Sequence, residues 1–259
     1  SAERIHTELN KILLSKQPSI GLKLLFDSEL LEIIFPELYN LAGVSTQAGV
    51  KHKDNFLHTI QVVDNVAENS DNLWLRWAAL LHDIAKPKTK KYVEGIGWTF
   101  HAHNFIGQKM VPEIFARLKL PLNEKMKYVQ KLVDLHMRPI ALVEDEVTDS
   151  AIRRLIVDAG EDLDDLLTLC EADITSKNEK KVKQYLTNFK ALRQKIVEVE
   201  ERDSLRNFQP PISGDEIISY FNIEPSRTVG IIKNGIKDAI LDGEIPNDKE
   251  KAWEYMISK

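Results

Sequence analysis

Apolar side chains recur every three to four residues through the first part of the chain. The recurrence covers three short runs between residues 4 and 34, with Pro18 opening the second run and Pro36 ending the third. This is the period of amphipathic helices, and proline is tolerated in the first turn of a helix but not in its interior. The pattern predicts a small helical module over residues 1–50, closed by the polar stretch 43–49.

The same period continues through most of the remaining sequence. It predicts helices over residues 55–68, 106–118, 124–136, 149–159, 162–175, 177–202, 213–221 and 229–241, with a short one after Pro246. A further helix carries the strongly apolar run 77–85 and stops at Pro87; Asp71 is its expected cap, and Asp149 is expected to cap a later helix. Between residues 88 and 100, two β-prone runs flank a Gly-containing turn, which predicts a short hairpin or an irregular loop.

The predicted fold is therefore all-α, with a short β-hairpin near residues 88–100 as its one exception. The stretch Phe208-Gln-Pro-Pro is typical of a linker. We expect three domains: an N-terminal helical module (1–50), a central helical domain (51–205) and a C-terminal helical tail (206–259).

Composition excludes several classes of protein. With 43% hydrophobic and 29% charged residues among 259, the chain has the profile of a globular protein rather than a disordered one. The single cysteine, Cys170, excludes an intramolecular disulfide and fits a reducing cytosol, so a cytoplasmic location is expected. No apolar stretch approaches the ~20 residues that span a membrane. The net charge of -5 argues against broad electrostatic capture of nucleic acid but leaves room for a local basic patch.

The most informative residues are the adjacent His82 and Asp83, which lie inside the apolar run 77–85. Burying an imidazole beside a carboxylate costs several kcal/mol unless a counter-charge compensates them, and a metal cation supplies that charge compactly. Further ligand-type residues lie in or beside other apolar segments: His58, His103, His136 and Asp173. Together they predict one metal site assembled from several helices, with His101 as a competitor for the role of His103.

The types of donor atom limit which metals can bind and which reaction they can support. Mixed imidazole and carboxylate ligation suits Mn, Fe, Co, Ni or Zn better than Mg or Ca. We expect a first ion held by His58, His82, Asp83 and Asp173, and a second held by His103 and His136. On one helix His82 and Asp83 would point about 100° apart, and the second carboxylate oxygen of Asp83 could bridge the two ions. Water on an open metal position becomes a hydroxide near neutral pH, which is the nucleophile for phosphoester hydrolysis.

Four further residues allow two interpretations each. Lys86 lies one turn after Asp83 and either binds phosphate and orients Asp83 or faces solvent at a helix end. Cys170 is either a thiolate ligand or, as we favour, a small buried hydrophobe. Arg153 and Arg154 either reach a phosphate or, as we favour, lie on a helix surface.

The order His58, His82-Asp83, Asp173 resembles the HD superfamily of metal-dependent phosphohydrolases. The resemblance extends along almost the whole chain. Segments 3–13, 18–19 and 35–38 are similar to the helical part that follows the catalytic head in bacterial tRNA nucleotidyltransferases and poly(A) polymerases. The remaining similar segments are 55–59, 81–87, 98–103 and 172–173, which correspond to the HD domain of that family, and 212–218 with 241–245, which correspond to its tail.

The resemblance implies an HD domain over 51–205, a neck-like module before it, and tRNA as a partner. The Gly-Ser loop and aspartate pair of the nucleotidyl-transferring head do not occur in this sequence, so we expect no nucleotide addition by this chain alone. We expect instead a metal-dependent phosphohydrolase acting on a nucleotide or an RNA 3′-end phosphate, with Asp83 and Lys86 in catalytic roles. The alternative is a tRNA-binding body with a structural or vestigial metal site. The sequence leaves open which metal, how many ions, which substrate and which oligomeric state apply.

Overall fold

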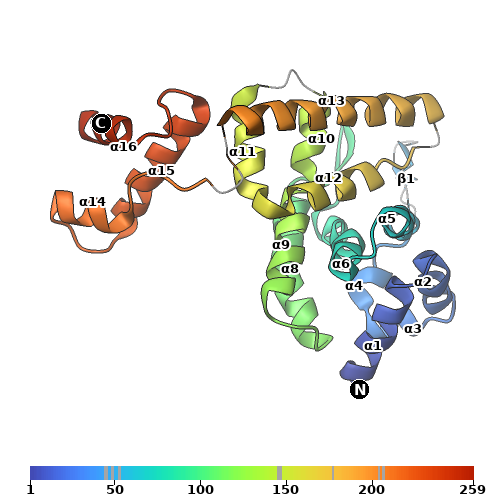
Figure 1. The fold of residues 1–259 in the computed structure, drawn as a ribbon. Coiled ribbons are helices and arrows are strands. Elements are labelled where there is room, and N and C mark those ends of the chain that lie inside the picture. Colours follow the sequence, from blue (N-terminus) through green and yellow to red (C-terminus); the bar gives the residue numbers. More distant parts are fainter. Residues whose placement is uncertain are drawn as a thin grey trace. The chain divides into compact units, whose positions relative to one another are not determined.

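The computed structural model describes residues 1–43, 46–47, 50–51, 54–144, 148–176, 178–203, 205 and 208–259. As predicted, the chain is mostly helical (Figure 1). Contacts group it into two compact units, residues 1–144 with 161–190 and residues 145–160 with 191–259. This grouping reflects contacts alone, and the three domains expected from the sequence stay a prediction. In the described part of the chain, no helix is both long and apolar enough to cross a membrane.

The first unit begins with four short helices and a two-residue pair of strands. The elements are α1 (Ala2–Leu13), α2 (Pro18–Asp27), α3 (Leu30–Ile34), α4 (Pro36–Tyr39), β1 (Thr46–Gln47) and β2 (Val50–Lys51). Pro18 and Pro36 each occupy the first turn of a helix, where the missing N–H costs nothing. Pro36 therefore starts α4, a helix of four residues that the sequence pattern did not indicate. Of the polar stretch 43–49, residues 44, 45, 48 and 49 lie outside the described residues.

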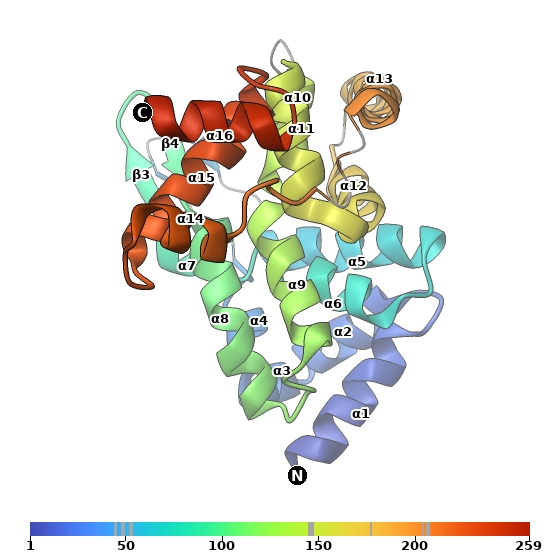
Figure 2. The same ribbon diagram turned by 60° about the vertical axis from the view of Figure 1, so that its left-hand side comes forward.

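The centre of the first unit is a layer of packed helices around α6. Its elements are α5 (Asn55–Asn69), α6 (Leu73–Leu81), α8 (His103–Arg117), α9 (Glu124–Leu135), α10 (Met137–Glu144) and α12 (Leu163–Ala172). Helix α6 is buried from Leu75 to Leu81, and it contacts α5, α9 and α12. Helices α8 and α9 run side by side (Figures 1 and 2). A Cβ at Gly107 would lie 3.1 Å from Val133 Cγ1, so glycine permits this close approach.

Helix α6 ends earlier than the apolar run predicts. It stops at Leu81, His82 is its C-cap, and residues 82–85 form a turn. Pro87 then lies in the first turn of the short helix α7 (Lys86–Thr89), because proline tolerates a helix start but not a continuing helix. His82 keeps helical backbone dihedrals as the C-cap, whereas Asp83 lies in the turn that follows, so the two residues do not lie together inside one helix as expected.

Two predicted caps are each displaced by one residue. Asn72, with extended backbone, accepts a hydrogen bond from Trp74 N and caps α6, whereas Asp71 is fully exposed. Thr148 caps α11 (Asp149–Ala159) by accepting from Ala151 N. Both predictions chose a carboxylate next to the true cap, because several residue types serve as caps and the backbone decides between neighbours.

The hairpin expected near residues 88–100 is present. Strands β3 (Lys91–Val93) and β4 (Gly97–Thr99) pair antiparallel, with Tyr92 opposite Trp98. The turn between them contains Gly95 at a φ of +80°, a conformation that glycine adopts without steric cost.

The second unit is also helical. The 3-10 turn η1 (Gly160–Asp162) joins α11 to α12, and the long helix α13 (Glu179–Asp203) runs from the first unit into the second. The other elements of the second unit are α14 (Gly214–Phe221), α15 (Arg227–Asp242) and α16 (Lys249–Ser258). Their core consists of the buried side chains Ile212, Ile217, Ile236, Ile240, Ala252 and Met256.

Arg153 and Arg154 lie on α11 and pair with carboxylates of the second unit. Arg153 contacts Asp203, and Arg154 contacts Asp238 and Asp242. These contacts give both arginines a structural role on a helix surface, as favoured from the sequence.

Candidate metal centre

Five helix ends of the first unit bring the candidate ligands together. His58 lies in the first turn of α5, and His103 is the first residue of α8. The others stand just beyond the last turn of a helix: His82 and Asp83 after α6, His136 after α9 and Asp173 after α12. The backbone can change direction at a helix end, so side chains from different helices can converge there.

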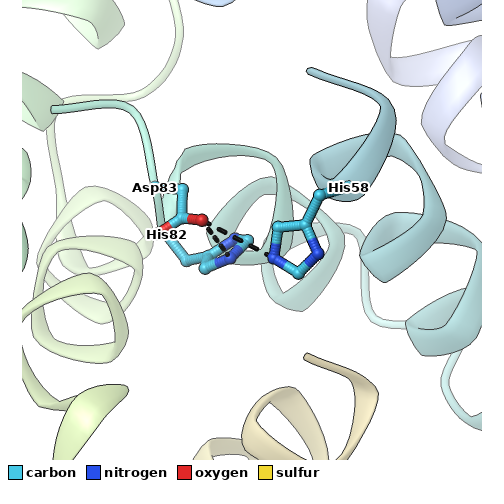
Figure 3. Close-up of side chains that lie close together, drawn as sticks. All are labelled: His58, His82 and Asp83. Carbon is cyan, nitrogen blue, oxygen red and sulfur yellow. Dashed lines mark ion pairs between the residues drawn. The ribbon is translucent and has the colours of Figure 1, made fainter. Parts of the chain in front are cut away.

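The first group of donors surrounds one oxygen of Asp83. His58 Nε2 lies 2.8 Å from Asp173 Oδ1 and 3.6 Å from Asp83 Oδ2. His82 Nε2 lies 3.3 Å from Asp83 Oδ2 and 3.5 Å from Asp173 Oδ1. Figure 3 shows both imidazoles directed at the carboxylate of Asp83. The two carboxylates and two imidazoles thus face a common point.

The second group surrounds the other oxygen of the same carboxylate. Asp83 Oδ1 lies 3.3 Å from His103 Nε2, which in turn lies 3.2 Å from His136 Nε2. The described residues therefore contain two sets with the spacing of a metal site, His58–His82–Asp83 and Asp83–His103–His136. Asp83 belongs to both and turns one oxygen toward each.

Backbone carbonyls hold three of the four imidazoles in one orientation. The Nδ1 atoms of His82, His103 and His136 lie 2.7, 2.9 and 2.7 Å from the carbonyl oxygens of Ala79, Phe100 and Val133. A carbonyl only accepts, so each Nδ1–H donates, and Nε2 is the nitrogen that faces the centre. This is the usual outer support of a metal-binding histidine.

His58 differs from the other histidines in its outer partner. Its Nδ1 lies 2.7 Å from the hydroxyl of Thr175. Sequence reasoning missed Thr175, although its position two residues after Asp173 placed it beside a candidate ligand.

Two buried atoms at the centre lack hydrogen bonds. Among the described residues, His82 Nε2 and Asp83 Oδ2 have no hydrogen-bond partner, although Lys86 Nζ forms an ion pair with that oxygen at 2.6 Å. Asp83 Oδ2 therefore has one cationic partner, while His82 Nε2 has none by the same criterion. An unsatisfied buried polar atom is costly, and a cation beside both atoms would give the nitrogen a partner. The nitrogen and carboxylate donors present therefore fit a divalent transition metal.

The electrostatics of the centre also favour a cation. Burial alone would raise the pKa values of Asp83 and Asp173, but attraction to His82 holds both well below their usual range. Burial opposes a charge on His82, yet the two carboxylates raise its pKa to about 10. Burial, reinforced by the neighbouring His82, lowers the pKa of His136 to about 4. The carboxylates thus create a negative potential that draws positive charge into the centre.

The remaining candidates lie outside the two sets. His101 is exposed, whereas His103 is buried and faces Asp83. Cys170 is buried and its Sγ donates to the carbonyl oxygen of His136 at 3.0 Å, which agrees with the role of a small packed residue. Lys86 does not simply face solvent, because its ammonium pairs with Asp83 and lies 5.6 Å from the centre of the Phe100 ring.

His103 follows a residue in an unusual backbone conformation. Ala102 has a φ of +59°, in the left-handed region that costs an L-residue about 1–2 kcal/mol. We expect Ala102→Gly to raise the free energy of unfolding by up to about 1 kcal/mol, measured by urea titration. The exposed Ala141, in the middle of α10, is the matched control: Ala141→Gly should lower the same quantity by about 0.5–1 kcal/mol. Destabilisation by both substitutions would contradict strain at Ala102.

Two family models match the chain. The HD domain model matches residues 55–177, which contain every residue of the two donor sets. A model described as the probable RNA and SrmB-binding site of polymerase A matches residues 1–41, the part that forms α1 to α4. The buried His/Asp cluster is thus located within the matched HD domain.

Curated relatives cover nearly the whole chain. It is 30% identical over 253 residues to the A-adding tRNA nucleotidyltransferase of Deinococcus radiodurans, a match that covers 96% of this chain and 56% of that protein. It is 29% identical over 266 residues to the CC-adding tRNA nucleotidyltransferase of Thermus thermophilus, with 98% and 56% covered. The multifunctional CCA protein of Pseudomonas fluorescens is 33% identical over 123 residues, covering 47% and 29%.

The chain spans little more than half the length of the two relatives that match it from end to end. The chain carries an HD domain behind a polymerase A-type RNA-binding region and is homologous to tRNA nucleotidyltransferases over nearly its whole length.

Proposed function

We propose that this chain is a metal-dependent phosphohydrolase that acts on phosphates of nucleotides or of RNA 3′ ends. In this proposal His58, His82, Asp83 and Asp173 hold a first divalent ion, and His103 and His136 hold a second that shares Asp83. The observation that carries the proposal is the placement of Asp83, whose two oxygens each face a separate set of imidazole nitrogens.

The residues of the centre would have different roles in this reaction. A bound divalent metal supplies an activated water and polarises the phosphoryl group. Asp83 and the outer carbonyls orient the imidazoles, and Lys86 balances the charge of Asp83 and can stabilise negative charge on the phosphate. His58 and Asp173 have side chains that are 14% and 16% exposed, so they form the side of the centre that a substrate can reach.

RNA is the partner that the N-terminal match supports. The matched model over residues 1–41 concerns RNA binding, and relatives are named for the addition of nucleotides to tRNA. We therefore propose tRNA, or an RNA 3′ end, as the macromolecular ligand. The alternative, an RNA-binding body with a vestigial metal site, is less well supported because all six donors are present and the centre is open at His58 and Asp173.

The proposal is tested by stripping the purified chain of metal with a chelator and reloading it separately with Mn, Fe, Co, Ni or Zn. Each form is assayed with a 2′,3′-cyclic nucleotide, a 2′-nucleotide and an RNA bearing a 3′-terminal phosphate. We expect hydrolysis by at least one reloaded form and none by the stripped chain. A chain that binds metal and RNA but hydrolyses none of these would instead be the RNA-binding body.

Lys86 provides a narrower test of the catalytic roles. We expect Lys86→Ala to lower kcat on the order of 10²-fold while the chain keeps its metal, because the ammonium contributes charge and not a metal-binding lone pair. Lys88→Ala is the matched control, since Lys88 is exposed on the same short helix. Equal rates for the two variants, measured on the same cyclic nucleotide, would assign Lys86 a purely structural role.

A further inference from the structure

A surface pocket continues from the open side of the metal centre. It has a volume of about 270 Å³, and His58 and Asp173 are part of its lining. Small-molecule pockets in proteins range upward from ~300 Å³, so this pocket lies at the small end and would take no more than one small ligand or part of one. A molecule that fills it would have one end beside two of the proposed metal ligands.

The lining of this pocket also includes apolar and aromatic side chains. Tyr185 and Phe189 lie four residues apart on α13, so they share one face of the helix, with Phe189 buried and Tyr185 half-buried. Ile140 from α10 and Ile174, both half-buried, add aliphatic surface. The other polar residues of the lining are Thr175, Ser176 and the exposed Lys181, which lies one turn before Tyr185 on the same helix.

We propose that this pocket binds the base of the terminal nucleoside, with the ring of Tyr185 as its stacking surface, while the attached phosphate lies at His58 and Asp173. The inference rests on the proposed function and deepens it: the substrate would be a nucleoside 2′,3′-cyclic phosphate or phosphomonoester, free or at an RNA 3′ end. The lining combines two proposed metal ligands, His58 and Asp173, with apolar and aromatic side chains, and a nucleotide likewise combines a phosphate with a flat base. A flat aromatic ring accepts any base, because every base has a π-face.

The direct test measures binding without relying on turnover. Calorimetric titration of the metal-loaded chain with adenosine 2′-monophosphate should show an affinity that falls on the order of 10-fold or more in Tyr185→Ala and is largely kept in Tyr185→Phe. Inorganic phosphate is the base-free probe, and its affinity should respond far less to Tyr185→Ala. Leu186→Ala, an exposed neighbour outside the pocket, is the matched control and should bind the nucleotide as the parent chain does.

A kinetic arm compares adenosine 2′,3′-cyclic phosphate with a methyl riboside 2′,3′-cyclic phosphate, which carries the same reacting group without a base. Tyr185→Ala should lower the kcat/KM for the adenosine substrate relative to that for the methyl riboside, by on the order of 10-fold, as for the nucleotide affinity. A short RNA ending in a 2′,3′-cyclic phosphate identifies the source of the nucleoside: a kcat/KM above that of the free nucleotide assigns RNA, and one below it assigns the free nucleotide.

The outcomes separate this inference from the proposed function. Hydrolysis with an unchanged substrate ratio and unchanged nucleotide affinity in Tyr185→Ala would overturn the base pocket and leave the phosphohydrolase standing. Absence of hydrolysis in the parent chain would overturn the phosphohydrolase, and the calorimetric comparison would still decide whether the pocket binds a base.

Discussion

Asp83→Asn is expected to remove the bound metal and to abolish phosphohydrolase activity, the largest functional loss that a single substitution should cause. Asparagine keeps the volume of the side chain but loses the charge and one of the two acceptor oxygens. Each oxygen of Asp83 faces a different donor set, so both proposed ions lose a ligand at once. The loss of activity should exceed the ~10–100-fold that changes to outer-shell residues cost at metal sites.

The measurement is the metal content per chain, by elemental analysis, together with the rate on a cyclic nucleotide. Asp27→Asn is the matched control, because Asp27 forms an exposed ion pair with Lys23 on α2 and lies outside the donor sets. It should retain the parent values of both quantities. An Asp83→Asn chain with undiminished metal content would show that the ion is bound elsewhere.

Arg76→Ala is expected to cause the largest loss of stability, about 3–5 kcal/mol in the free energy of unfolding. The Arg76 side chain is 2% exposed, and its guanidinium donates to the carbonyl oxygens of Leu13 and Ser15 at the end of α1. It also donates to those of Ala67 and Ser70 at the end of α5. One cation thus serves the C-terminal carbonyls of two helices, which have no partners within their own helices.

Alanine would leave these carbonyls without donors and open a space the size of the guanidinium. Denaturant unfolding followed by circular dichroism measures the loss. Arg4→Ala, an exposed arginine on α1, should change the free energy of unfolding by less than about 0.5 kcal/mol. Similar small changes in both variants would mean that water replaces the guanidinium at little cost.

Periodicity predicted the helices well where apolar stripes were long, as in α5, α9 and α13. It failed where a helix ended inside an apolar run. The run 77–85 stays apolar beyond Leu81 because residues 82–85 are buried in the turn, so hydrophobicity could not mark the end. Helix α10 was missed because it follows His136 at once and carries Pro139 in its first turn, which looks like a break in the sequence.

The candidate ligands could be chosen from the sequence because a histidine or aspartate in an apolar segment needs a compensating partner. The same reasoning predicts that they form one site, but the distances between them could not be derived from the sequence, since these depend on how five helix ends meet. The hydrogen bonds that support the imidazoles could not be predicted from the sequence either. The carbonyl partners of His82, His103 and His136 depend on the exact residues at which α6 and α9 end and α8 begins. Tyr185 lies in the helix predicted over residues 177–202, and only the fold shows that it lines the same pocket as Asp173.

The central claim is that Asp83 joins two divalent ions at this centre, and metal-loaded crystals test it most directly. Diffraction at the absorption edge of the loaded metal, with Mn or Co in excess, should show anomalous peaks inside the cluster. We expect one ion contacted by His58, His82, Asp83 and Asp173, and a second by His103 and His136, about 3.5–4 Å apart with Asp83 between them. Anomalous density without contact to Asp83, or none within the cluster, would contradict the claim.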